Sequence, residues 1–414
     1  MKTKKLYFLF ITFTLILTLL FPVYADDENI EDSIDDSEII DVTSDIDDIP
    51  TINSRAAIVY DRTSGTIIYG KSENEKRKMA STTKIMTATI VIENATLTDT
   101  VTVSKKAAGT GGSRLGLKTG DKVTVYDLLY GLMLCSGNDA AVALAEHVGG
   151  DLEGFANLMN KKAQSLGLTN THFVTPHGLD NDEHYTTAYE LAKLADYALK
   201  NQTFANIVAT KNYTVTINGY SKNLNNTNEL LGNLNGVYGV KTGFTNGANR
   251  CLVTSIKRDD LDIICIVLGA DTKKFRTQDS VKLIEYTYKN YEMVDIYSII
   301  HSEFDSWKKD NLSKFNIIKG ISNDLDISLV KIENNKIPIK KENVKDISVV
   351  IDCSYILNSP VYKNTSIGTL NLSIKNEVIL NLDIIVNNTI KKKSSFDYFK
   401  QLFINFIPNI ESVL

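Results

Sequence analysis

Ser81 and Lys84 stand three residues apart at the start of an apolar, helix-compatible run. In a helix, residues at this spacing lie on one face, one turn from each other. A serine hydroxyl is a weak nucleophile until a base takes its proton, and a lysine that burial or a second cation keeps neutral can be that base. A helix N-terminus also points backbone N–H groups toward developing negative charge. The pair therefore predicts nucleophilic catalysis, although Ser-x-x-Lys alone is a common pattern.

Two further motifs could complete such a site. Ser136-Gly137-Asn138 lies between two apolar segments, so its hydroxyl can be held rigidly beside a buried site. Lys241-Thr242-Gly243 lies in a β-rich run, where a strand can bind a substrate backbone and a lysine can bind an anion. Similar triplets in polar loops or turns are weaker candidates: 72–74, 118–120 and 221–223.

The segments around these motifs predict a mixed α/β domain over residues 52–294. The predicted strands are 56–60, 66–69, 101–103, 122–125, 213–217, 239–244, 251–257 and 262–268. The predicted helices begin at Ser81 and then cover 127–135, 139–147, 151–166, 187–199 and 280–291. Because strands come at both ends and helices in the middle, the two ends of the domain are expected to share one antiparallel sheet.

Composition restricts the classes of function. The chain has 414 residues and a net charge of −5, which allows two or more domains and leaves no dominant basic patch for nucleic acid. The four cysteines lack paired spacing and lie in largely apolar runs, which predicts buried free thiols rather than disulfides or a zinc site. No helix-borne His-Glu-x-x-His pattern occurs, so neither a metal nor another cofactor is expected.

The N-terminus has the pattern of a targeting segment. Residues 1–25 combine a lysine-containing start, an apolar run and a small residue, Ala25, at the expected cleavage point of a signal peptide. A retained membrane anchor is the alternative. Residues 26–51 are acidic and lack aromatic side chains, which predicts a disordered spacer. We therefore expect the remainder of the chain to lie outside the cytoplasm.

The C-terminal part of the chain has a different pattern. Over residues 297–388 helical periods give way to short alternating runs, which predict a separate β-rich domain without a catalytic constellation. In residues 390–414, three lysines follow Ile390, and apolar positions then recur every three or four residues. This pattern predicts an amphipathic helix that lies in the membrane interface and is too short and polar to span a bilayer. A helix docked on the β-rich domain is the alternative.

The order and approximate spacing of the three motifs resemble those of serine penicillin-binding proteins and serine β-lactamases. The flanking segments are similar to those of the low-molecular-mass D-alanyl-D-alanine carboxypeptidases: 117–121, 136–140, 173–180 and 239–245. The likeness is strong over residues 55–291, and the β-rich domain and tail fit the family's layout more loosely. It implies a β-lactamase/transpeptidase-like catalytic domain followed by a β-rich domain and an amphipathic tail helix.

The resemblance also implies an activity. The chain is expected to be a serine-type carboxypeptidase that removes the terminal D-alanine from peptidoglycan stem pentapeptides and binds β-lactam antibiotics covalently at the outer face of the cytoplasmic membrane. Ser81 is expected to form the acyl-enzyme, with Lys84 as base and Ser136 as proton relay. The expected substrate-binding residues are Asn138, Lys241, Thr242, Gly243 and Phe244. The expected oxyanion donors are the backbone N–H groups of Ser81 and Phe244.

Several alternatives remain at this level. A DD-endopeptidase would cut cross-links by the same chemistry. A weak β-lactamase would need a deacylating base, for which Glu153 at a helix start is the available carboxylate. A wall-binding protein with a decayed site would not need all three motifs intact, and His177 is a second candidate base. Two residues depart from the family pattern: Met79 stands where proline is usual, and Asn249 stands where glycine is common.

Overall fold

The structure is a computed structural model that describes residues 49–406, with side chains as far as residue 403. The expected signal peptide, most of the acidic spacer and residues 407–414 lie outside the described residues. The chain divides into two compact units, with the boundary between Lys289 and Asn290. The strand that follows, β10 (Tyr291–Asp295), pairs with β13 (Lys336–Lys340) of the C-terminal unit, although the predicted boundary at 294 left it in the catalytic domain.

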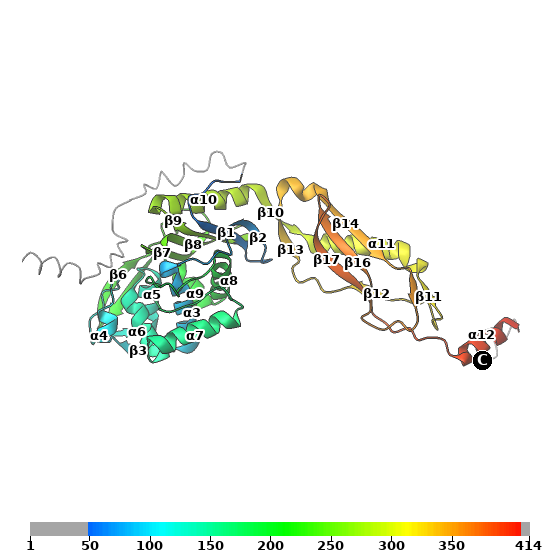
Figure 1. Ribbon diagram of the computed structural model, residues 1–414, viewed down its shortest axis with the longest axis horizontal. Helices are drawn as coiled ribbons and strands as arrows, with labels where there is room; N and C mark the ends of the chain where they lie inside the picture. The colour runs from blue at the N-terminus through cyan, green and yellow to red at the C-terminus, as the bar shows by residue number, and fades with distance from the viewer. Residues whose placement is uncertain (1–48, 407–414) are drawn as a thin grey trace, which may run out of the picture. The chain divides into compact units, whose positions relative to one another are not determined.

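A five-stranded antiparallel sheet organises the N-terminal unit, in the order β2-β1-β9-β8-β7 (Figure 1). Its strands are β1 (Ala56–Asp61), β2 (Ile67–Lys71), β7 (Val237–Thr245), β8 (Asn249–Arg258) and β9 (Leu261–Ala270). Because β1 pairs directly with β9, the two ends of the unit share the sheet, and that prediction is confirmed. Strand β7, which carries Lys241, lies at an edge.

Helix α10 covers one face of this sheet, and the other helices of the unit lie on the opposite side (Figure 1). The helices are α3 (Lys84–Asn94), α4 (Lys105–Ala108), α5 (Val125–Met133), α6 (Asn138–Gly149), α7 (Leu152–Ser165), α8 (Ala188–Leu199), α9 (Gln202–Val208) and α10 (Lys273–Asn290). Two small antiparallel sheets of two strands each complete the unit: β3 (Thr100–Thr102) with β4 (Lys122–Thr124), and β5 (Asn212–Ile217) with β6 (Tyr220–Asn225). Side-chain oxygens of Thr124, Asp151 and Thr187 accept backbone N–H groups and so cap α5, α7 and α8.

The C-terminal unit is mainly β. A four-stranded antiparallel sheet has the order β12-β17-β16-β14, and β11 pairs in parallel with β15. The strands are β11 (Asn316–Ile318), β12 (Ile327–Leu329), β14 (Ile347–Cys353), β15 (Ile356–Asn358), β16 (Ser366–Ile374) and β17 (Glu377–Val386). All four cysteines of the chain are free, as predicted; Cys251 and Cys265 are buried, whereas Cys135 and Cys353 are partly exposed.

This β-rich unit also contains a helix that the sequence analysis did not predict. Helix α11 (Ile296–Asn311) directly follows β10, and the Asp295 carboxylate caps it by accepting the backbone N–H of Ser298. Its buried side chains, Ile296, Ile300 and Phe304, recur every four residues and pack into the core of this unit. Such a narrow apolar stripe on an otherwise polar helix gives a weak periodic signal. Trp307 follows on the same helix and packs its ring near those of Phe304, Phe315 and Tyr355.

The tail helix α12 spans Ser395–Phe406, so it starts later than the predicted residue 390. Ile390 instead pairs with Val361 and is buried in the core of the C-terminal unit. No helix within residues 49–406 is long and apolar enough to cross a membrane.

Ser81 does not open the α-helix that follows it. It lies in a 3₁₀ turn, Ala80–Thr83, and α3 begins at Lys84. Ala80 has a positive φ of 48°, a conformation that costs energy for a residue with a Cβ atom. The turn must therefore be held by its surroundings.

Residues 172–186 form a loop that supports this turn. Gly178 lies so close that a Cβ atom on it would be 2.0 Å from the Ala80 carbonyl oxygen. His184 Nδ1 accepts the backbone N–H of Val174 at 3.0 Å, so the ring proton is on Nε2 and is donated to Thr83 Oγ1 at 2.8 Å. Thr83 Oγ1 in turn donates to the Ala80 carbonyl oxygen at 2.8 Å. His184 therefore links the loop to the turn in its neutral form.

Burial lowers the pKa of His184 to about 4, from 6.5 in an unfolded chain. Between these values the unfolded state binds a proton that the folded state excludes, so the free energy of unfolding falls as the pH is lowered from 6.5 toward 4. His184→Asn keeps an acceptor for Val174 and cannot titrate. Its loss of stability between pH 7.5 and 4.5, from urea titrations, should be smaller than that of the wild type by on the order of 2–3 kcal/mol. Equal losses in both proteins would contradict this account.

Candidate active site

Lys84 is fully buried and reaches the hydroxyl of Ser81. Its Nζ lies 2.7 Å from Ser81 Oγ, so the two side chains meet although Ser81 precedes the first residue of α3. Nζ also lies 2.7 Å from Asn138 Oδ1 and 3.1 Å from the backbone oxygen of His177. A neutral amine can donate its two N–H groups to the Asn138 and His177 oxygens. Its lone pair then faces the Ser81 hydroxyl, which is the arrangement that a general base requires.

The Ser136-Gly137-Asn138 motif lies at the turn between α5 and α6, where Asn138 contacts Lys84. Ser136 is fully buried with a positive φ of 59°, and its Oγ has no hydrogen-bond partner among residues 49–406. A buried hydroxyl without a hydrogen-bond partner costs free energy, and such a group is often found where a side chain has a catalytic role. Asn138 Nδ2 donates to the Gly111 carbonyl oxygen at 2.8 Å, which orients its Oδ1 toward Lys84.

The Lys241-Thr242-Gly243 motif lies on edge strand β7, beside the turn that carries Ser81. Lys241 and Thr242 are buried, and Thr242 Oγ1 lies 2.8 Å from Thr227 Oγ1. A Cβ atom on Gly243 would be 3.1 Å from the backbone nitrogen of Ser81, so a side chain there would be crowded against the turn. Phe244 follows, with its ring stacked under the guanidinium of Arg250 at 3.8 Å.

The structure thus gathers the predicted residues from three separate elements. The 3₁₀ turn with α3 supplies Ser81 and Lys84, the α5–α6 turn supplies Ser136 and Asn138, and β7 supplies the lysine-threonine-glycine motif. Within residues 49–406, no three His, Cys, Asp or Glu side chains are grouped so that they could hold a metal ion.

The structure also places the two alternative catalytic residues named from the sequence, His177 and Glu153, and the thiol of Cys135 beside Ser136. His177 contributes its backbone oxygen, while its ring Nδ1 accepts the Leu179 N–H at 3.2 Å and burial lowers its pKa to about 3. A ring with so low a pKa is a poor base near neutral pH. Burial raises the pKa of Cys135 to about 11, so its thiol stays protonated. Glu153 is exposed in the first turn of α7.

Sequence reasoning missed two contributors to this site. The His177 backbone oxygen could not be found from residue types, because every residue has one. Asp139 was detectable, since an acidic residue directly after Asn138 falls in the first turn of α6, where carboxylates are favoured. Its carboxylate is fully buried and accepts backbone N–H groups of the preceding loop.

The two departures from the family pattern fit the structure. Asn249 has a φ of 58°, the left-handed conformation in which glycine is free and asparagine is the best tolerated of the larger residues. Met79 is fully buried and its carbonyl oxygen accepts the Thr82 hydroxyl at 2.6 Å, so it packs beneath the turn and holds it.

Known proteins share this arrangement along most of the chain. Residues 43–272 match the family model described as D-alanyl-D-alanine carboxypeptidase, and residues 308–392 match the C-terminal domain of penicillin-binding protein 5. The D-alanyl-D-alanine carboxypeptidase DacF of Bacillus subtilis is 33% identical over 84% of this chain and 88% of its own. DacA of Escherichia coli is 32% identical over 86% of this chain and 89% of its own.

The solved structures agree with the sequence relatives. The crystal structure of the D-alanyl-D-alanine carboxypeptidase DacD from Francisella tularensis superposes with a TM-score of 0.70 at 27% identity, covering 85% of this chain and 96% of that one. The catalytic unit and the β-rich unit therefore both match those of one known group of serine peptidases. The chain belongs to the D-alanyl-D-alanine carboxypeptidase family.

Proposed function

We propose that this protein cleaves the terminal D-alanyl-D-alanine bond of peptidoglycan stem peptides through an acyl-enzyme on Ser81. The observation that carries the proposal is the position of the buried Lys84 Nζ, 2.7 Å from both Ser81 Oγ and Asn138 Oδ1. In the first step Ser81 Oγ attacks the carbonyl carbon and its proton passes to Lys84. The backbone N–H groups of Ser81 and Phe244 hold the developing oxyanion, and each such donor contributes on the order of 3 kcal/mol.

Ser136 then completes the acylation. Its unpartnered Oγ accepts a proton from the Lys84 ammonium while it gives its own to the departing nitrogen, so the C–N bond breaks and D-alanine leaves with a neutral amine. Water next attacks the Ser81 ester, with Lys84 again as base, and frees the shortened peptide.

The motif on β7 binds the end of the substrate. The terminal D-alanine carries a carboxylate, and the Lys241 ammonium and Thr242 hydroxyl offer it charge and a hydrogen-bond donor. Gly243 leaves room for the substrate backbone along the strand edge. A β-lactam antibiotic presents a carboxylate and a strained amide in the same relation, so the same attack opens its ring and leaves an ester on Ser81.

Lys84→Arg tests the base, because arginine remains protonated and cannot take the serine proton. Acylation by fluorescent penicillin should slow about 100- to 10,000-fold, the usual contribution of a general base. Release of D-alanine from a D-Ala-D-Ala peptide should fall equally. Lys162→Arg is the matched control, since Lys162 pairs with Glu93 elsewhere on this unit, and Ser81→Ala gives the unlabelled baseline. Near wild-type acylation of Lys84→Arg would exclude Lys84 as the base.

We further propose that the enzyme is exported and works outside the cytoplasmic membrane, where its substrate lies. The support is the signal-peptide pattern of residues 1–25. Expression in a bacterial host should yield a mature chain that begins at Asp26, and mass spectrometry of the secreted protein measures this. An intact N-terminus on protein from the membrane fraction would instead indicate a retained anchor.

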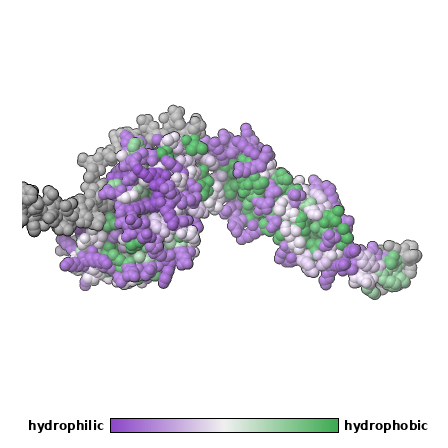
Figure 2. All heavy atoms as spheres, viewed as in Figure 1, coloured by the Kyte–Doolittle hydropathy of each residue, from purple (hydrophilic) through white to green (hydrophobic). Residues whose placement is uncertain are grey.

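The tail is proposed to attach the enzyme to the outer surface of the membrane. Its apolar side chains are unusually exposed: Phe396 is 72%, Phe399 62%, Leu402 59% and Phe403 52% accessible. Figure 2 shows this hydrophobic surface on the C-terminal helix. In the alternative, the helix would bury this face against the β-rich unit. Three lysines before the helix, Lys391 to Lys393, favour an anionic surface.

A chain that ends at Ser394 keeps Ile390 in its core and lacks residues 395–414, which include the helix. It should remain folded, release D-alanine at the normal rate, and fail to sediment with phosphatidylglycerol vesicles at low salt. In the full-length chain, Phe399→Glu combined with Phe403→Glu should lower vesicle binding more than about tenfold, because interfacial burial of two phenylalanines is lost. Failure of the unmodified mature protein to sediment would disprove the anchoring role.

A further inference from the structure

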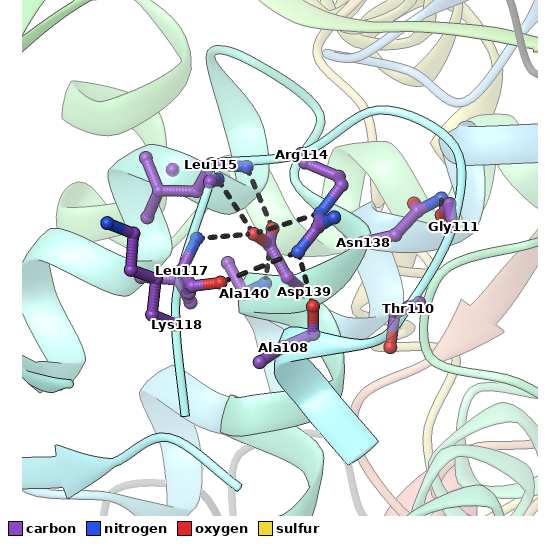
Figure 3. Close-up of polar contacts among 12 residues, drawn as sticks. Ala108, Thr110, Gly111, Arg114, Leu115, Leu117, Lys118, Asn138, Asp139 and Ala140 are labelled. Atoms are coloured by element: carbon purple, nitrogen blue, oxygen red, sulfur yellow. Dashed lines mark hydrogen bonds and ion pairs between the residues drawn. The ribbon is translucent and has the colours of Figure 1, made fainter. Parts of the chain in front are cut away.

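The carboxylate of Asp139 fastens a loop to the active site. It is fully buried, and it accepts three backbone N–H groups from that loop: Leu115 to Oδ1 at 2.8 Å, Gly116 to Oδ2 at 2.7 Å and Leu117 to Oδ2 at 2.9 Å (Figure 3). The Ala140 N–H adds a fourth hydrogen bond at 2.9 Å. Arg114 Nε is 3.9 Å from Oδ2. Hydrogen bonds to an ionised acceptor are about twice as strong as neutral ones, so this loop is firmly held.

The same loop holds Asn138 from the other side. The backbone N–H of Asn138 donates to the Ser113 carbonyl oxygen at 2.8 Å, and its Nδ2 donates to the Gly111 carbonyl oxygen at 2.8 Å. Those two bonds fix the main chain and the side-chain amide of Asn138, and thereby aim Oδ1 at Lys84 Nζ. The route from the Asp139 carboxylate to Lys84 thus consists of the loop and Asn138.

The α5–α6 turn and the loop of residues 111–117 also pack closely against each other. A Cβ atom on Gly137 would be 3.0 Å from Asp139 Oδ1 and 3.0 Å from the Leu115 nitrogen. Ser136, just before it, has its backbone in the unfavourable left-handed region. A shift of the loop would therefore release the turn that presents both Ser136 and Asn138.

We propose that Asp139 is a positioning residue for acyl transfer: by anchoring residues 111–117 it sets the place of Asn138 and, through it, of the Lys84 amine. The proposal rests on the proposed function of Lys84 and Ser81. Asp139 itself touches no reacting atom. Three of its four hydrogen bonds go to a loop 22 to 24 positions earlier in the chain, so its role extends beyond capping α6.

Asp139→Asn is the direct test. An amide in place of the carboxylate has one acceptor oxygen, so the backbone N–H groups on its other side lose their partner. The first-order rate of acylation by penicillin, from stopped-flow at saturating antibiotic, should fall about 10- to 100-fold, as expected for a catalytic group displaced by up to 1 Å. The dissociation constant of the complex before acylation should change less than about threefold, since strand β7, which is proposed to bind the carboxylate of the antibiotic, is untouched.

Asp279→Asn is the matched control. Asp279 on α10 is also a buried carboxylate that accepts backbone N–H groups, from Asn53 at 3.1 Å and Ser54 at 2.7 Å, and it lies outside the motifs of the site. This variant should lose thermal stability and keep the wild-type acylation rate. If Asp139→Asn loses stability and acylates as fast as Asp279→Asn, then Asp139 is purely structural and the proposal is overturned.

Two measurements keep the test decisive if Asp139→Asn folds poorly. The first-order rate constant of acylation reports on the folded molecules alone, whatever fraction of the sample they make up. Asp139→Glu is a second variant, which keeps the negative charge and displaces the loop. Hydrogen exchange of residues 115–117 should accelerate in the Asp139 variants and not in Asp279→Asn. Unchanged exchange with slowed acylation would overturn the loop route. Because these rates are compared with those of Lys84→Arg, failure of the base assignment and failure of the Asp139 proposal give different results.

Discussion

The buried amine of Lys84 is the constraint on which the rest of the catalytic unit depends. A lysine without access to water is costly unless every polar group around it is matched. Here the oxygens come from three distant parts of the chain: the Ser81 hydroxyl, the Asn138 amide and the His177 backbone. Each of these must be placed within a few tenths of an ångström, so the 3₁₀ turn, the α5–α6 turn and the 172–186 loop are fixed together around one atom.

That constraint explains where the backbone is strained. Ala80 and Ser136 both have positive φ, and both flank groups that face Lys84. Strain of this kind persists only when the surrounding structure determines it. Gly178 lies close to the Ala80 backbone, and Gly137 lies close to the Asp139 carboxylate, so a Cβ atom at either position would be crowded. Close packing around Ala80 and Ser136 thus offsets the energetic cost of their strained backbone, and the five-stranded sheet supports the two turns that contain them.

Much of this arrangement was predictable from the sequence, for identifiable reasons. The three motifs combine residue types with a fixed order, and strands such as β1 and β9 give alternating or continuous apolar runs whose pairing closes the sheet. The contact to Lys84 from the His177 carbonyl was not predictable, because it depends on a backbone atom that every residue has. Asp139 was detectable as an acidic residue in the first turn of α6, but its backbone partners at residues 115–117 were not, because an N–H group carries no sequence signal. Helix α11 was missed because only Ile296, Ile300 and Phe304 mark its buried face.

Helix α11 also gives the protein a built-in optical reporter. Trp307 is the single tryptophan of the chain, and its indole packs beside Phe304, Phe315 and Tyr355 in the core of the C-terminal unit. The catalytic unit contains tyrosines but no indole. Emission excited at wavelengths that only indole absorbs therefore reports on the β-rich unit alone, whereas covalent labelling by penicillin reports on the other. The unfolding of the two units can therefore be followed separately in one sample without any mutation.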